Sequence, residues 1–108
     1  MNELVSVITP SYNSARFIED SITSVIQQTY DNWELIIVDD ASTDHSRDII
    51  KKMAKKDKRI LPIFLSNNSG SAIARNTAIN NSQGRYIAFL DADDIWRREK
   101  LEKQIAFM

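Results

Sequence analysis

The acidic cluster Asp91, Asp93 and Asp94 is the densest group of potentially reactive side chains in the sequence, and it directly follows the apolar run 86–90. Asp91 and Asp93 are two residues apart, so in an extended segment their side chains share one face, and a bend at Ala92 could turn both toward one ion. Magnesium and manganese bind carboxylate oxygens and usually take only one or two from the protein, leaving room for water and substrate phosphates. The spacing indicates either a phosphate-bridging metal site at Asp91 and Asp93 or an ordinary acidic turn.

Two other motifs offer groups that could bind a nucleotide. The pair Asp39 and Asp40 closes an apolar run, and a carboxylate there can accept hydrogen bonds from a ribose hydroxyl or a base N–H. Tyr12 could stack on a base, while Pro10 fixes the backbone where another run ends. The alternatives are a simple turn for the acidic pair and ordinary packing for the tyrosine.

A third motif combines Gly70, one of two glycines in the chain, with Arg75. A helix N-terminus with a guanidinium nearby is a natural site for an anion. Arg75 could equally pair with Asp39 or Asp40 and hold two loops together. Both roles remain open from the sequence alone.

Four short apolar runs predict the buried strands that position these motifs, and segments with helical spacing lie between them. The predicted strands are 5–9, 34–38, 60–65 and 86–90. The predicted helical faces carry Ile18, Ile22, Val25, Ile26 and Thr29, then Ile49, Ile50, Met53 and Ala54, and the small residues Ala72, Ala74 and Ala78. Strands that alternate with helices predict an α/β fold with a mostly parallel sheet covered on both faces.

Candidate capping residues predict where two of the helices begin. Ser42, Thr43 and Asp44 offer side-chain oxygens that could cap the second helix. Asp94 is the expected cap of the last helix, with Trp96 at the start of its packed face.

In parallel sheets, ligands bind beyond the carboxyl ends of the strands. Every motif above falls at that edge, which predicts a binding site more strongly than any one motif does.

Composition excludes several classes of protein. The chain has 108 residues, 43% of them hydrophobic and 27% charged, which predicts one soluble globular domain. Its formal net charge of -1 argues against a nucleic-acid partner. It has no cysteine and no window near the roughly 18 apolar residues of a membrane segment, so we expect a cytoplasmic protein. A place at the inner membrane face would require parts of a longer parent protein.

Four strings together resemble the nucleotide-binding half of the family 2 inverting glycosyltransferases, which have the GT-A fold. They are VSVITPSYN (5–13), WELIIVDDASTD (33–44), NSGSAIARN (68–76) and GRYIAFLDADD (84–94), in the expected order. The resemblance implies a Rossmann-like three-layer sandwich, a nucleoside-diphosphate sugar donor, usually a UDP-sugar, and Mn²⁺ or Mg²⁺ as cofactor.

The resemblance also implies a role for each matched residue. Pro10 and Tyr12 would line the base, and Asp40 would contact the base edge. Asp91 would lie near the ribose and the metal, and Asp93 would coordinate the metal. Gly70 and Arg75 match a loop and a helix beside the nucleotide.

In this family the catalytic base lies further along the chain, so we expect it beyond Met108. Residues 1–108 would then be a single nucleotide-sugar-binding domain, the donor half of a longer transferase, and inactive alone. Its acceptor would be a saccharide or a lipid-linked sugar in polysaccharide biosynthesis. Leu101, Ile105 and Met108 share one apolar face of the last helix, which makes a homo-oligomer plausible.

Two other functions fit parts of the sequence. A phosphatase of the haloacid dehalogenase type also places D-x-D at a strand end, but normally after the first strand, and it carries Thr or Val where this chain has Ile95. A nucleotide-binding module without catalysis is the second alternative. No G-x-G-x-x-G follows the first predicted strand, which excludes a typical dinucleotide-binding domain.

Overall fold

The computed structural model describes residues 3–106 and contains strands and helices in strict alternation. The strands are β1 (Val5–Ser11), β2 (Trp33–Asp39), β3 (Ile60–Phe64) and β4 (Tyr86–Phe89). The helices are α1 (Ile18–Ile26), α2 (Ser46–Lys56), α3 (Ser71–Asn80) and α4 (Lys100–Ile105). The predicted α/β fold is therefore confirmed, and each predicted strand lies within two residues of its observed bounds at either end.

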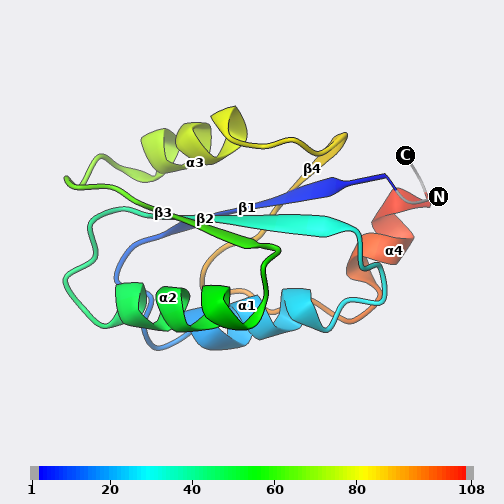
Figure 1. The fold of residues 1–108 in the computed structure, drawn as a ribbon, viewed down its shortest axis with the longest axis horizontal. Helices are drawn as coiled ribbons and strands as arrows, with labels where there is room; N and C mark the ends of the chain where they lie inside the picture. The colour runs from blue at the N-terminus through cyan, green and yellow to red at the C-terminus, as the bar shows by residue number, and fades with distance from the viewer. Residues whose placement is uncertain (1–2, 107–108) are drawn as a thin grey trace.

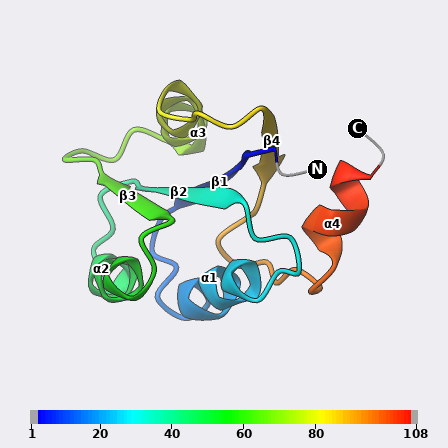
Figure 2. The same cartoon turned by 45° about the vertical axis from the view of Figure 1, so that its right-hand side comes forward.

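The four strands form one parallel sheet in the order β3-β2-β1-β4. The helix α3 covers one face, and α1 and α2 cover the other, which gives the three layers visible in Figures 1 and 2. The central strands β1 and β2 are apolar on both sides because both sides are covered. The parallel arrangement brings the carboxyl ends of all four strands to one edge of the sheet.

The two faces of the sheet bury cores of different size. The larger core lies under α1, α2 and α4, and it includes Val7, Leu35 and Trp33 from the strands. The smaller core lies under α3, where Ala74 and Ala78 are fully buried against Ile8, Ile36 and Val38. Small side chains allow α3 to pack closely on the sheet, as its alanine-rich sequence predicts.

The end of the chain differs from the prediction. The last helix α4 begins at Lys100 and its N-cap is Glu99, so Asp94 does not cap it. The backbone N–H of Asp94 instead donates to the Asp91 carbonyl at 3.0 Å, which closes a turn after β4. Leu101 and Ile105 are buried, while Met108 of the predicted apolar face lies outside the described residues. Between residues 3 and 106, no helix is long and apolar enough to cross a bilayer.

Candidate functional site

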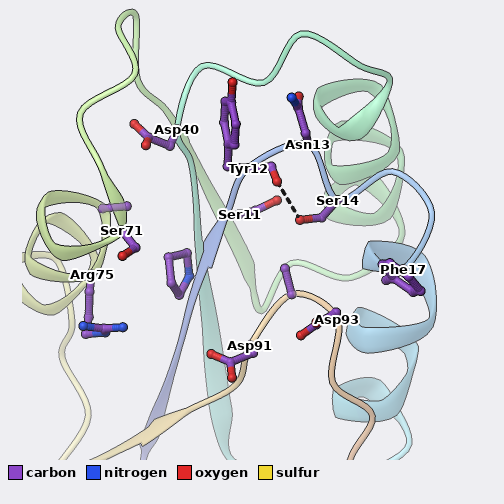
Figure 3. Close-up of a pocket in the computed structure, with 13 residues that line it drawn as sticks. Ser11, Tyr12, Asn13, Ser14, Phe17, Asp40, Ser71, Arg75, Asp91 and Asp93 are labelled. Atoms are coloured by element: carbon purple, nitrogen blue, oxygen red, sulfur yellow. Dashed lines mark hydrogen bonds between the residues drawn. The ribbon is translucent and has the colours of Figure 1, made fainter.

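A cavity of about 550 Å³ opens at the carboxyl edge of the sheet (Figure 3). Its walls come from the loop after β1, from the residue after β2, from the first turns of α3 and from the loop after β4. The predicted site residues that line it are Pro10, Tyr12, Asp40, Arg75, Asp91 and Asp93. The predicted residue Gly70 does not line the cavity itself, but it immediately precedes Ser71, which does.

Asp91 and Asp93 lie next to each other at one side of this cavity, and both are exposed to it. Ala92 between them is buried in the larger core, and the turn closed by the Asp94 N–H and the Asp91 carbonyl leaves both acids exposed. Neither carboxylate has a hydrogen-bond or ion-pair partner among the described residues. The one cationic side chain that lines the same cavity, Arg75, forms no ion pair with either of them.

The donor set at this position fits a cation that shares its ligands with a substrate. No group of three or more His, Cys, Asp or Glu side chains gathers anywhere in residues 3–106, so the described part of the protein offers no complete cage. Two carboxylates are nevertheless what Mg²⁺ or Mn²⁺ usually takes from a protein when phosphates and water complete its shell. The residues therefore fit the expected metal, which Asp91 and Asp93 would hold.

The third acid of the cluster faces elsewhere. Asp94 lines a separate hollow of about 450 Å³ together with Ile95, Trp96 and part of α4. It is absent from the lining of the main cavity. The structure thus separates Asp94 from the pair Asp91 and Asp93.

Asp39 and Asp40 point to opposite faces of the sheet, as consecutive strand residues do. The Asp39 carboxylate is fully buried and accepts hydrogen bonds from the Ser42 backbone N–H at 3.0 Å and the Ser42 hydroxyl at 2.6 Å. The Arg47 Nε lies 3.9 Å from it. Asp39 therefore holds the start of the β2–α2 loop and does not reach the cavity.

The Asp40 carboxylate accepts the backbone N–H groups of Ser69 at 2.7 Å and Gly70 at 2.8 Å. These bonds fix the loop that leads into α3, where Gly70 has a positive φ of 96°. A carboxylate has about four lone-pair sites, so Asp40 keeps acceptor capacity toward the cavity that it lines.

The alternative in which Arg75 pairs with Asp39 or Asp40 is wrong. Asp39 is next to Arg47, and Asp40 is occupied by backbone N–H groups. The Arg75 guanidinium lies over the Phe89 ring, 6.0 Å from its centroid, and pairs with no carboxylate of the described residues. Its positive charge is available to the cavity that it lines.

The β1–α1 loop forms one wall of the cavity, and Tyr12 is the only residue of this loop that the sequence predicts as part of the site. The N–H groups of Asn13, Ser14 and Ala15 donate in turn to Ser42 Oγ at 2.9 Å, Ser46 Oγ at 2.8 Å and Asp44 Oδ2 at 3.1 Å. The loop that carries Tyr12 is thus held by side chains from the start of α2. Figure 3 also shows the Ser14 hydroxyl donating to the Tyr12 carbonyl, at 3.2 Å.

The N-cap of α2 is His45, which makes no side-chain cap hydrogen bond, so none of the three expected residues occupies the N-cap position. Asp44 lies just before it, and its Oδ1 accepts the N–H of Ser46, the first residue of the helix, at 2.9 Å. Burial raises the pKa of Asp44, but hydrogen bonds from Ser46 and from the Ala15 backbone outweigh burial and hold that pKa below its usual value. Ser42 and Thr43 do not cap the helix, because both bind Asn13 instead.

One cavity residue without a sequence signal is Phe17, which is 45% exposed at the N-cap position of α1. Tyr12 is 49% exposed and forms a different part of the wall. An apolar residue just before a helix reads as packing in the sequence, and only the structure reveals its exposure. The finished cavity combines two aromatic rings, a free guanidinium and unpaired carboxylates, which suits a ligand with a flat ring and phosphate groups bridged by a cation.

Comparison with known sequences agrees with this chemistry. The chain matches the sequence model of glycosyl transferase family 2 over residues 6–108. A putative teichuronic acid biosynthesis glycosyltransferase of Bacillus subtilis, TuaG, is 57% identical over 97% of this chain and 42% of its own length. The Escherichia coli UDP-Glc:alpha-D-GlcNAc-diphosphoundecaprenol beta-1,3-glucosyltransferase WfgD is 50% identical over 97% of this chain and 41% of its own length. The chain spans about two fifths of the length of these relatives.

Solved structures of GT-A glycosyltransferases share the fold. Staphylococcus aureus TarS 1-349 in complex with UDP has a TM-score of 0.89 and 33% identity over 95% of this chain and 31% of that chain. The mannosyltransferase PcManGT from Pyrobaculum calidifontis, in complex with GDP-Man and Mn²⁺, has a TM-score of 0.90 and 30% identity over 97% of this chain and 32% of its own. The expected GT-A arrangement is therefore confirmed.

Proposed function

This chain belongs to glycosyl transferase family 2, and on that premise we propose that its cavity binds a nucleoside-diphosphate sugar, with a UDP-sugar favoured, through Mn²⁺ or Mg²⁺ on Asp91 and Asp93. The observation that carries the proposal is that two carboxylates without partners face the same cavity as Tyr12 and Asp40. Two Escherichia coli relatives, the glucosyltransferases WfgD and WfaP, are named for the donor UDP-Glc. Together with the TarS complex with UDP, they support the choice of nucleotide. The PcManGT complex with Mn²⁺ supports the choice of metal.

We assign the base to the end of the cavity formed by Pro10, Tyr12 and Asp40. The Tyr12 ring is exposed enough to stack on a base, and stacking needs no particular hydrogen-bond pattern. The lone pairs of Asp40 that Ser69 and Gly70 leave free can accept a base N–H. Gly70 acts through the loop, since its own N–H is already bound by Asp40.

The diphosphate belongs between Arg75 and the carboxylate pair. Asp91 is assigned to the ribose and the metal, and Asp93 to the metal alone. Arg75 is the one cationic residue among those that line the cavity, and its guanidinium has no carboxylate partner in the described residues. The walls of the cavity thus hold the nucleotide at both ends and orient its diphosphate.

Sugar transfer breaks the bond between the sugar and the diphosphate, so negative charge grows on the nucleotide that leaves. A bound cation supplies Lewis-acid stabilisation of that charge. Inverting transfer also needs a carboxylate base that takes the proton of the acceptor hydroxyl. We place this base, and the pocket for a saccharide or lipid-linked acceptor, in the further part of a longer transferase, and we propose that residues 1–108 alone bind the donor without transferring it.

Membership of this family removes the support for a phosphatase of the haloacid dehalogenase type. A nucleotide-binding module without metal remains the competing function, and a titration separates the two. The measurement is the calorimetric Kd of the purified chain for UDP, GDP and dTDP, each with and without Mn²⁺. The proposal predicts that UDP binds and that Mn²⁺ strengthens its binding by about tenfold or more. Equal UDP affinity with and without Mn²⁺ would favour the metal-free module, and no nucleotide binding would refute both.

The carboxylates provide a matched pair of variants. Asp93→Asn should abolish most of the Mn²⁺ effect on UDP affinity, because an amide is a poorer and neutral ligand for a hard cation. Asp94→Asn removes the same charge one residue away, but from a side chain that faces the other hollow, so its Mn²⁺ effect should stay within about twofold of wild type. Equal losses in the two variants would show that the three carboxylates have been divided wrongly.

A further inference from the structure

Helix α1 carries a buried polar stripe that faces the segment after β4. Ser21, Ser24 and Gln28 lie on the buried side of the helix or just beyond its end, and all three contact the chain between residues 92 and 101. The contacts are hydrogen bonds to main-chain atoms, so they fix the path of the backbone. The hydrogen bonds from α1 therefore fix the backbone of the loop that carries Asp93.

Ser21 makes the contacts nearest to Asp93. Its hydroxyl oxygen is fully buried and lies 2.8 Å from the Ala92 carbonyl oxygen and 2.5 Å from the Asp94 carbonyl oxygen. A serine hydroxyl has one hydrogen, so the two carbonyls share it in a three-centre bond. The acceptors belong to the residues immediately before and after Asp93.

This arrangement determines which way Asp93 can face. Both flanking carbonyls turn down toward Ser21, and the Ala92 side chain is buried in the core on the same side. The Asp93 side chain is left exposed on the cavity side, where it has no partner among the described residues. The Ser21 hydroxyl thus holds the backbone in a bend that presents Asp93 to the cavity.

We propose that Ser21 is a positioning residue for the metal-binding carboxylate Asp93. The proposal rests on the proposed function, because it assumes that Asp93 binds the cation. Without the hydroxyl, the buried Ala92 carbonyl and the partly buried Asp94 carbonyl lose this donor, and a buried acceptor without a donor is unfavourable. The turn can relieve this by rotating its carbonyls toward water, and that rotation carries Asp93 away from the cation.

The chain offers a close control for this substitution. Ser24 lies on the same helix, is also buried, donates to the Ser21 carbonyl at 2.7 Å and accepts the Trp96 N–H at 3.1 Å. Ser24→Ala removes a comparable pair of hydrogen bonds but leaves both carbonyls around Asp93 with their donor. A loss of stability shared by the two variants can then be separated from an effect on the metal.

The test compares the Kd for UDP with and without Mn²⁺, by calorimetry, in the chain of residues 1–108. The ratio of the two values is the Mn²⁺ enhancement. In Ser21→Ala we expect the enhancement to fall by about tenfold, the size typical for residues that orient a metal ligand, while the Kd without metal changes by less than about twofold. Ser24→Ala should keep the wild-type enhancement. Ser21→Ala combined with Asp93→Asn should bind no more weakly than Asp93→Asn alone, because both changes disable the same ligand.

Ser21→Cys replaces the hydroxyl with a larger thiol that is only a weak donor, so its enhancement should lie between wild type and Ser21→Ala. It also covers the case in which Ser21→Ala fails to fold, which thermal unfolding would detect. An unchanged enhancement in folded Ser21→Ala or Ser21→Cys, or an equal loss in Ser24→Ala, overturns the positioning role while wild type still supports the proposed function. Absence of any enhancement in wild type overturns the metal site and, with it, the role of Ser21.

Discussion

Alanine at Gly84 is expected to destabilise the fold strongly, at the end of the sheet away from the cavity. A methyl group on Gly84 would lie 2.5 Å from Ser6 Oγ, 2.6 Å from Ser6 N and 2.9 Å from the Leu4 carbonyl oxygen. Two of these three atoms belong to the backbone and cannot rotate away. The start of β4 would therefore have to move away from β1.

That movement also breaks a buried hydrogen-bond network. The Gly84 N–H donates to Ser6 Oγ at 2.8 Å, and the Ser6 hydroxyl donates to Glu34 Oε2 at 2.5 Å. The Gln83 N–H donates to the same carboxylate oxygen at 2.7 Å. Overpacking costs about 1–3 kcal/mol, and the two displaced backbone donors cost about 1 kcal/mol each. We expect the free energy of unfolding to fall by about 3–5 kcal/mol, a large part of the stability of a typical domain.

Urea unfolding followed by tryptophan fluorescence measures this change, because Trp33 and Trp96 are both buried. The double variant with Ser6→Ala distinguishes the cause of the loss. Ser6→Ala removes the Ser6 hydroxyl but leaves the close contacts of the new methyl group with Ser6 N and the Leu4 carbonyl oxygen. The double variant should therefore be at least as unstable as Gly84→Ala. Recovery of stability in the double variant, or a loss below about 1 kcal/mol in Gly84→Ala, would refute the reasoning.

Three further predictions concern loops at the two edges of the sheet. Gly70→Ala should cost about 1–3 kcal/mol in urea unfolding without any clash, because Gly70 has φ 96° and ψ 158° and its Cβ would meet nothing within 4 Å; an unchanged midpoint would contradict this. Asp40→Asn should speed amide hydrogen exchange at Ser69 and Gly70, since the amide nitrogen of Asn cannot accept an N–H, and unaltered exchange there would count against it. Hydrogen bonds from Arg59 lower the pKa of Asp57, and that of Asp44 is also lowered, so both carboxylates contribute stability above the usual Asp value of 3.8 and lose it as the pH falls below that value. Urea midpoints measured down through this range should therefore fall less steeply in the double variant Asp44→Asn and Asp57→Asn, and an equal slope would exclude these two groups as the cause.

The sequence was sufficient for the order of elements and the edge where the site lies. Strands such as 34–38 are apolar on both faces and end in charged residues, so their position in a covered parallel sheet follows from composition and periodicity. A parallel sheet then brings the carboxyl ends of all its strands to one edge. Motifs that are far apart in sequence, from Tyr12 to Asp93, can therefore be grouped from the sequence alone. Contact details were beyond the same reasoning.

The interpretation of Arg75 shows why those details were missed. Charge alone made Asp39 and Asp40 equally good partners for Arg75, but the strand turns Asp39 under the sheet toward Arg47 and gives Asp40 to two backbone donors. Which donors reach a carboxylate depends on loop geometry, and local sequence does not specify it. Ser21 was missed for a related reason, since a serine within an amphipathic helix reads as a surface residue unless the loop that covers it is known.

The carboxylates at the strand ends differ in their hydrogen bonding, and this difference supports a ligand at the turn that carries Asp91 and Asp93. This fold can satisfy buried acids: Asp39 receives two hydrogen bonds from Ser42, and Asp40 receives two from the loop before α3. Asp91 and Asp93 receive none among the described residues, although the Ser21 hydroxyl lies beneath the same turn and donates to its main-chain carbonyls instead. Two neighbouring negative charges without donors repel each other and contribute nothing to the stability of the folded chain. At the proposed metal site, a bound cation would remove this repulsion, and the Ser21 hydroxyl already holds the backbone that presents the two acids.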